Sequence, residues 1–201
     1  GSTTSQTITI TDNENAPTVT LATSATSIAE NAGSSLTLTA TLSNATTEDV
    51  TVALSTSGTG TEGTDYSTIS DITVTAGSTT GTASFTPTDD SVYEGNETGI
   101  VAISSVSGGS ANESGTPQEV TITINDNESA PTVTLSSSAT SISEDAGSSL
   151  TLTATLSVAT TADVTVGIST SGTGTEGTDY STISNITISA GATTGTASFT
   201  P

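Results

Sequence analysis

The sequence predicts an all-β fold made of tandem seven-stranded antiparallel sandwiches with an immunoglobulin-like shape. The chain repeats itself, because the residues APTVTL at 16–21 return at 130–135 with an offset of 131 − 17 = 114 residues. Apolar residues also alternate with Thr and Ser in many short segments, and no window carries the apolar stripe of a helix. Repetition at the length of a domain indicates an array of modules.

The same offset of 114 residues divides the chain into three parts. It carries GTGTEGTDY from Gly58 to Gly172, GTASFTP from Gly81 to Gly195, and TITITDNEN at Thr7 onto TITINDNES at Thr121. We therefore expect a terminal strand of a preceding repeat at 1–15, a complete repeat at 16–129 and an incomplete second repeat at 130–201. The first part has no equivalent of 88–113, so it cannot fully complete the second repeat.

Seven segments of the complete repeat have the period-2 alternation of half-buried strands. The clearest is 34–43, SSLTLTATLS, in which every second residue from Leu36 to Leu42 is apolar. This ordered pattern argues against disorder, and the β-branched Thr on the outer face favours strands without adding charge. Gly, Asn, Asp and Pro occupy the gaps as turn residues. The predicted strands are, in order, Val19–Ile28, 34–43, Val50–Leu54, Ile69–Val74, Thr82–Phe85, Ile100–Val106 and Val120–Ile124.

The charge of the chain has only one sign. It contains 21 Asp and Glu and no Lys, Arg or His, which gives a formal net charge of −21. No ion pair between side chains is possible, so each carboxylate is solvated, protonated or bound to a metal cation. Such a polyanion is repelled by nucleic acid and by anionic lipid, and we exclude both as partners.

The composition also argues against an enzyme and indicates an extracellular protein. Without His, Cys or Lys, the usual general base, thiolate and Schiff-base chemistry is missing. A carboxylate pair such as Asp89 and Glu94 lacks the aromatic cleft expected of a glycosidase. An acidic chain rich in Thr, Ser and Gly and free of Cys is typical of secreted and surface proteins of bacteria. No apolar run approaches the roughly 20 residues of a membrane span, so we expect no membrane insertion.

The acidic residues of the complete repeat lie at predicted strand ends, and we expect several to meet at one pole of the sandwich. Without a cation they would repel one another and raise each other's pKa values. Calcium resolves this conflict, because it takes 6–8 oxygen ligands in irregular geometry, whereas magnesium demands a strict octahedron. The candidates are Glu30, Asp65, Asp89, Asp90, Glu94, Glu97, Asp126 and Glu128.

Four motifs occur in order between residues 16 and 129: SIAENAG, GTDY, TDDSVYEGNET and a closing DNE. Together they resemble the Calx-β family, the calcium-binding sandwich of sodium/calcium exchangers and of many long bacterial surface proteins. The resemblance implies that the eight acidic residues named above are calcium ligands. Asn127 stands where an acid is often found in the closing triplet of the family, which leaves the number of ions open.

The partial repeats carry only parts of this ligand set. Glu144 and Asp179 are present in the second repeat, and Asp12 and Glu14 in the N-terminal segment. The sequences TDNENAP and NDNESAP also look like the calcium-binding linker of cadherins, although the other acidic motifs of cadherins are missing. In both interpretations calcium lies near the junction between repeats and makes it rigid.

We therefore expect a calcium-binding structural repeat that stiffens and extends a long extracellular adhesin or surface fibre. Its partners would be calcium ions and neighbouring repeats, with lateral association of copies in a fibre as a further expectation. The alternative is an adhesive sandwich that itself recognises a glycan or a protein; two Phe and three Tyr offer little material for such a surface. A calcium sensor would need an effector domain. Tyr66 and Tyr93 are expected to pack locally, and Glu62 is expected to be a surface charge.

Overall fold

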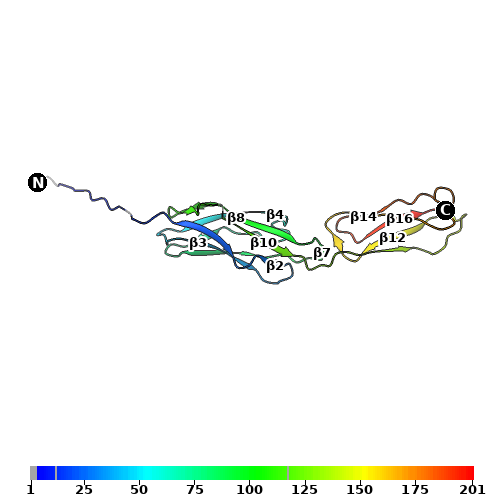
Figure 1. Ribbon diagram of the computed structural model, residues 1–201, viewed down its shortest axis with the longest axis horizontal. Helices are drawn as coiled ribbons and strands as arrows, with labels where there is room; N and C mark the ends of the chain where they lie inside the picture. The colour runs from blue at the N-terminus through cyan, green and yellow to red at the C-terminus, as the bar shows by residue number, and fades with distance from the viewer. Residues whose placement is uncertain (1–3, 12, 117) are drawn as a thin grey trace.

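The computed structural model describes residues 4–11, 13–116 and 118–201. The molecule is elongated, with two β bodies placed end to end and the N-terminal segment extending away from the first, so that the two termini lie at opposite ends (Figure 1). The elements of the described residues are all strands, which confirms the predicted all-β class. We call β1 to β10 the first module and β11 to β16 the second module. No helix in the described part of the chain has the length and hydrophobicity needed to cross a membrane.

The first module is a sandwich of two sheets. One sheet has the order β6-β3-β1-β9 and the other has the order β2-β10-β8-β4-β5. Most pairs are antiparallel; β1–β9 and β2–β10 are parallel. The strands are β1 (Thr18–Thr23), β2 (Ser27–Ala29), β3 (Leu36–Leu42), β4 (Val50–Gly58), β5 (Ile72–Val74), β6 (Thr80–Phe85), β7 (Val92–Tyr93), β8 (Glu97–Ser107), β9 (Asn112–Glu113) and β10 (Glu119–Asn125).

One segment predicted as a single strand is divided between the two sheets. The segment Val19–Ile28 is two strands, because β1 pairs with β3 in one sheet and β2 pairs with β10 in the other. The chain changes sheets at a local turn, where the Thr23 hydroxyl donates to the Ala25 carbonyl oxygen at 2.9 Å. The two-residue strands β7 and β9 were not predicted, since two residues are too short to show alternation.

The core of the first module follows the predicted alternation. In β3 the side chains of Leu38, Ala40 and Leu42 are buried, while the intervening Thr residues point outward. Tyr66 is 1 % exposed and stacks on Phe85 with ring centroids 4.6 Å apart, so the prediction of local packing is confirmed for this tyrosine. Gly99 makes room for this pair, because a Cβ atom there would lie 2.7 Å from the Phe85 ring.

The second module repeats part of this arrangement. Its largest sheet has the order β11-β12-β16, and β14 pairs with β15. Its buried apolar cluster is small, with Ala154, Leu156, Ile186 and Ile188 at the centre. The strands are β11 (Val133–Ser137), β12 (Leu150–Leu156), β13 (Ala159–Thr160), β14 (Val164–Val166), β15 (Ile186–Ile188) and β16 (Thr194–Phe199).

The N-terminal segment, expected to be a strand, forms none over residues 4–11 and 13–15. Its equivalent in the repeat is β10, which is held by pairing with β8 and β2. The N-terminal segment pairs with no strand among the described residues. Its two isoleucines are consequently exposed, Ile8 by 83 % and Ile10 by 92 %.

Candidate metal centre

The β2 and β7 ends of the first module face the second module (Figure 1), and candidate carboxylates lie next to these strands. Three loops and the segment after β10 meet there: the residue after β2, the turn before Tyr66, and the long connection from β6 to β8 that contains β7. Two clusters of three carboxylates form in this region, each with oxygen atoms within 4.8 Å of one another. We call them the Glu30 group (Glu30, Asp126, Glu128) and the Asp65 group (Asp65, Glu94, Glu97).

The Glu30 group is created by the parallel pairing of β2 with β10. Ala29 lies opposite Asn125 in this pair, and the Glu30 backbone N–H donates to the Asn125 carbonyl oxygen at 2.9 Å. The next residues along the two strands, Glu30 and Asp126, therefore leave the sheet side by side. Glu30 is only 6 % exposed, which is unusual for a carboxylate in a protein without cationic side chains.

The Asp65 group is created by the hydrogen bonds of a turn to the start of β8. The Gly60 backbone N–H donates to the Thr98 carbonyl oxygen at 3.0 Å, next to Glu97. Within the turn, Asp65 Oδ2 accepts a hydrogen bond from the Thr61 backbone N–H at 2.6 Å, which fixes the carboxylate. The group thus depends on contacts between segments more than 30 residues apart.

The electrostatics of both groups favour protonation in the absence of a cation. Burial raises the pKa of Glu30 from 4.5 to about 7, and the charges of Asp90, Glu128 and Asp126 act in the same direction. Burial likewise raises the pKa of Glu94 from 4.5 to about 7, followed by the charges of Asp65 and Glu97. Burial and the neighbouring Asp65 also raise the pKa of Glu97.

Asp126 behaves differently because the backbone stabilises its charge. Burial opposes its ionisation, but the N–H groups of Glu128, Gly95 and Glu94 donate to it and lower its pKa. Burial, and then the hydrogen bond and charge of Asp126, raise the pKa of Glu128. The Oε2 atom of Glu128 is shielded from solvent and has no hydrogen-bond partner. A buried polar atom of this kind normally finds a partner, and a cation held by the Glu30 group would supply one.

The donor set suits a hard divalent cation. All six side chains offer carboxylate oxygens, the ligands that calcium prefers, and the groups lie in loops that tolerate irregular coordination. The chain has no Lys, Arg or His that could neutralise them instead. The residues present therefore fit calcium.

Six of the eight predicted ligands of the first module belong to these two groups. Asp90 lies next to both, because its backbone N–H donates to Glu30 Oε1 at 3.2 Å and its charge contributes to the raised pKa values of Glu30 and Glu94. Asp89 is exposed, and its charge acts on Glu128. As metal ligands all eight stay predictions.

The ligands predicted in the partial repeats lie elsewhere. Glu144 and Asp179 join no group of three among the described residues and instead line a groove of the second module. Glu14 lines a polar pocket at the opposite end of the first module, together with Pro17 and Thr46. Asp12 lies outside the described residues.

Two residues near these loops have roles that the sequence reasoning missed. Glu62, expected to be a surface charge, accepts hydrogen bonds from the Thr56 hydroxyl and the Ile69 backbone N–H, both at 2.7 Å. The equivalent residue Glu176 accepts the same two kinds of hydrogen bond in the second module. The presence of this glutamate in both repeats could therefore have indicated a structural role. Asn96 Oδ1 accepts the Asp126 backbone N–H at 3.2 Å and links the long loop to the segment after β10.

The long connection from β6 to β8 also forms the contact between the modules. Its strand β7 pairs in parallel with β13 of the second module, with Val92 opposite Ala159 and Tyr93 opposite Thr160. Glu94 directly follows β7 in the sequence, and Asp90 lies two residues before it. The segment that carries the carboxylates is therefore the segment that the next module binds.

One family of known proteins matches both modules. The family profile described as "Calx-beta domain" matches residues 12–128 and 126–194. Among solved structures, the apo-form Calx CBD1 domain is similar at 18 % identity and a TM-score of 0.46, over 55 % of this chain and 99 % of that one. CBD12 from CALX1.2 is similar at 18 % identity and a TM-score of 0.44, over 87 % of this chain and 70 % of that one. The calcium binding domain CBD12 of CALX1.1 is similar at 18 % identity and a TM-score of 0.46, over 89 % of this chain and 74 % of that one. A search of curated proteins gives no match.

Proposed function

Because the chain belongs to the Calx-beta family, we propose that it is a calcium-binding structural repeat protein whose junctions become rigid when calcium binds. The observation that carries the proposal is the pair of carboxylate groups at the junction, together with the shielded and unpartnered Oε2 of Glu128. Solved structures with a related fold include one described as a calcium binding domain, which supports the choice of cation. The proposal assigns no catalysis to the chain.

In this proposal each carboxylate group holds one ion. Glu30, Asp126 and Glu128 would bind the first, and Asp65, Glu94 and Glu97 the second, with backbone carbonyls and water completing the coordination. Calcium supplies positive charge where burial and mutual repulsion now disfavour ionised carboxylates. Asp90, adjacent to both groups, is the residue best placed to serve either ion.

Calcium would stiffen the junction through the loop that contains β7. Glu94 belongs to the Asp65 group and directly follows β7, whose partner β13 belongs to the second module. Ions that fix this loop reduce the number of orientations open to the second module. Without calcium, repulsion between carboxylates loosens the same loop, and the two modules gain freedom to bend.

We further propose that the chain is part of a long extracellular adhesin or surface fibre. Residues 1–15 would be the terminal strand of a preceding repeat, 16–129 a complete repeat and 130–201 an incomplete second repeat. The internal repetition, the absence of Cys and the charge of −21 support this setting. Calcium is abundant outside cells, and extracellular modules use weak calcium sites of this class.

Isothermal titration of calcium into the chelator-stripped protein tests the proposal. We expect uptake of one ion per group, with one event lost in Glu94→Gln and the other in Glu128→Gln. Glu48→Gln is the matched control, since Glu48 is exposed and its equivalent in the second module is Ala162. If the wild-type protein takes up no calcium, or if the control loses as much uptake as the two variants, the proposal is wrong.

A further inference from the structure

Glu62 lies in the turn that carries Asp65 into the metal centre. The turn follows β4 and ends at the buried Tyr66. Its backbone is closed by two hydrogen bonds, from the Gly63 N–H to the Tyr66 carbonyl oxygen at 2.7 Å and from the Asp65 N–H to the Thr61 carbonyl oxygen at 2.9 Å. Glu62 is half-buried, although it belongs to neither of the two carboxylate groups. Its carboxylate is therefore held by other contacts.

Both carboxylate oxygens of Glu62 accept hydrogen bonds from the protein. The Thr56 hydroxyl donates to Oε2 and the Ile69 backbone N–H donates to Oε1, each at 2.7 Å. Thr56 belongs to β4, before the turn, and Ile69 lies after the turn, where its side chain packs against the apolar core. Hydrogen bonds to a carboxylate are about twice as strong as those between neutral groups. Glu62 thus ties the strand that enters the turn to the segment that leaves it.

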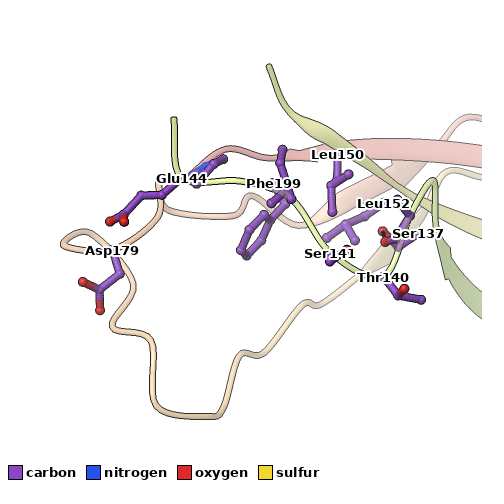
Figure 2. Close-up of a pocket in the computed structure, with 11 residues that line it drawn as sticks. Ser137, Thr140, Ser141, Glu144, Leu150, Leu152, Asp179 and Phe199 are labelled. Carbon is purple, nitrogen blue, oxygen red and sulfur yellow. Dashed lines mark hydrogen bonds between the residues drawn. The ribbon is translucent and has the colours of Figure 1, made fainter. Parts of the chain in front are cut away.

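The second module contains the same arrangement. Glu176 accepts hydrogen bonds from the Thr170 hydroxyl at 3.0 Å and from the Ile183 backbone N–H at 2.8 Å. The turn that it closes carries Asp179, which Figure 2 shows projecting from the loop. Asp179 joins no group of three carboxylates among the described residues, yet the backbone of its turn makes the same hydrogen bonds. The glutamate therefore shapes the turn itself, independently of a metal centre.

Asp65 meets the other two carboxylates of its group only if the turn keeps its position. Asp65 Oδ2 accepts a hydrogen bond from the Thr61 N–H at 2.6 Å, so the direction of the carboxylate follows the backbone of the turn. The Asp65 carbonyl oxygen accepts the Thr88 N–H at 2.9 Å, which joins the turn to the connection from β6 to β8. Glu94 comes from this connection and Glu97 from β8. A displaced turn would therefore carry one carboxylate of the Asp65 group away from the other two.

We propose that Glu62 is a positioning residue for calcium binding by the Asp65 group: its two hydrogen bonds hold the turn in place, and it does not itself contact the ion. This inference rests on the proposed calcium function. Replacement of a residue that orients metal ligands typically lowers metal affinity by about 10- to 100-fold. The Glu30 group is formed by the pairing of β2 with β10, so the role of Glu62 is confined to one of the two ions.

Two conservative replacements separate the geometry of Glu62 from its charge. In Glu62→Gln the amide oxygen can accept the Ile69 N–H and the amide nitrogen can donate to the Thr56 hydroxyl, so both contacts survive without the charge. In Glu62→Asp the charge survives, but the side chain is shorter by one methylene group and does not reach both partners. The proposal predicts that Gln substitutes for Glu at this position and that Asp does not.

Isothermal titration of calcium into the chelator-stripped full-length chain tests the role in binding. We expect Glu62→Ala and Glu62→Asp to weaken, by at least about tenfold, the uptake event that Glu94→Gln removes. The other event should keep its wild-type affinity, and Glu62→Gln should match the wild type in both. Glu176→Ala is the matched control, because it breaks the same contacts in the second module, and it should leave both events unchanged. Unchanged affinity in Glu62→Asp, equal losses in Glu62→Asp and Glu62→Gln, or weakening of both events overturns the proposal.

Amide hydrogen exchange measured by NMR in chelator gives a reading that needs no calcium. The Thr61 N–H is bonded to Asp65 Oδ2, and the Thr88 N–H is bonded to the Asp65 carbonyl oxygen. Both amides should exchange faster in Glu62→Asp than in the wild type, because the turn is no longer held at its two ends. In Glu62→Gln both should exchange at the wild-type rate. Wild-type exchange at Thr61 and Thr88 in Glu62→Asp overturns the proposal.

The two measurements separate the failure of this inference from the failure of the proposed function. If the wild-type protein takes up two ions and Glu62→Asp binds both with unchanged affinity, only the positioning role is wrong. If the wild-type protein takes up no calcium, the proposed function is wrong, and the effect of Glu62 on affinity is rejected with it.

Discussion

The two modules have nearly the same sequence but bury it differently. Val19 and Leu21 of β1 are 0 % and 7 % exposed, whereas their equivalents Val133 and Leu135 of β11 are 44 % and 55 % exposed. Both pairs lie on strands with the same register to the next strand. The difference lies in the opposite sheet, where the first module has β8 and β10. Local sequence therefore forms the strand, and a partner from a distant part of the chain decides whether it is buried.

The same comparison applies to the carboxylates. Glu30 belongs to a group of three, while its equivalent Glu144 joins none among the described residues. Asp65 and Asp179 keep the same bond to the backbone of their own turn, at 2.6 Å and 2.7 Å, so their local structure is equal. The acids that complete the two groups of the first module come from β8, from the segment after β10 and from the connection that contains β7, all of which follow β6 in the chain.

The largest expected effect is that of calcium on the first module. At a free concentration a hundredfold above the dissociation constant, each ion adds about 2.7 kcal/mol to the free energy of unfolding, or about 5 kcal/mol for two ions. We expect the melting temperature of the first module to rise by at least about 10 °C, and that of the second module to stay nearly constant. Calorimetry in calcium and in chelator measures both transitions. Equal shifts in the two would contradict the assignment of the sites to the first module.

Truncation of the stacked phenylalanines comes next. Phe85→Ala removes a fully buried ring and should lower the free energy of unfolding by about 3–5 kcal/mol. Phe199→Ala is the matched change in the second module, and its cost should be clearly smaller because Phe199 is only half-buried. Chemical denaturation of each variant gives the two values. A cost at Phe199 equal to that at Phe85 would show that the groove is closed in solution.

A smaller effect is expected from pH in the absence of calcium. The pKa values of Glu30 and Glu94 are about 7 in the folded protein and 4.5 when unfolded, so the folded state binds more protons between these values. The contribution of these two groups to stability is therefore fully present below pH 4.5 and is lost as the pH rises through 7. The lowered pKa of Asp126 affects stability only at more acidic pH, below its ordinary value of 3.8. Melting curves between pH 5 and 8 should show a decline of a few degrees in chelator. The Glu30→Gln/Glu94→Gln variant should lose most of this slope, and an unchanged slope would contradict the assignment.

The smallest expected effect is at the contact between the modules. Ala159→Pro disturbs β13 and should weaken its pairing with β7 by about 1 kcal/mol. Ala45→Pro is the matched control, since Ala45 occupies the equivalent position in the first module but forms no strand. Small-angle X-ray scattering in calcium should show a wider range of molecular shapes for Ala159→Pro only. The same widening for the control would argue that the loop, not the strand pair, sets the orientation.

Much of the fold was predictable because it follows from local alternation. The segments around Leu38, Val52 and Ile122 were expected as strands and are strands, and the buried residues are the apolar ones of the pattern. The split of Val19–Ile28 into β1 and β2 was not predictable, because the two halves have the same alternation and differ only in which sheet accepts them. The contact between β7 and β13 was missed for a related reason, since it joins two residues from each module.

The sequence by itself determined the repetition of modules, the β class, the negative charge and the placement of acids at strand ends. These properties depend on residue type and on spacing along the chain. Only the tertiary structure decided that the acids form two groups, with Glu30 joined to Asp126 and Glu128, and Asp65 joined to Glu94 and Glu97. Those meetings depend on the register of β2 with β10 and on a turn that bonds to the start of β8. A register between distant segments is fixed by the packing of the whole sandwich, which no local pattern encodes.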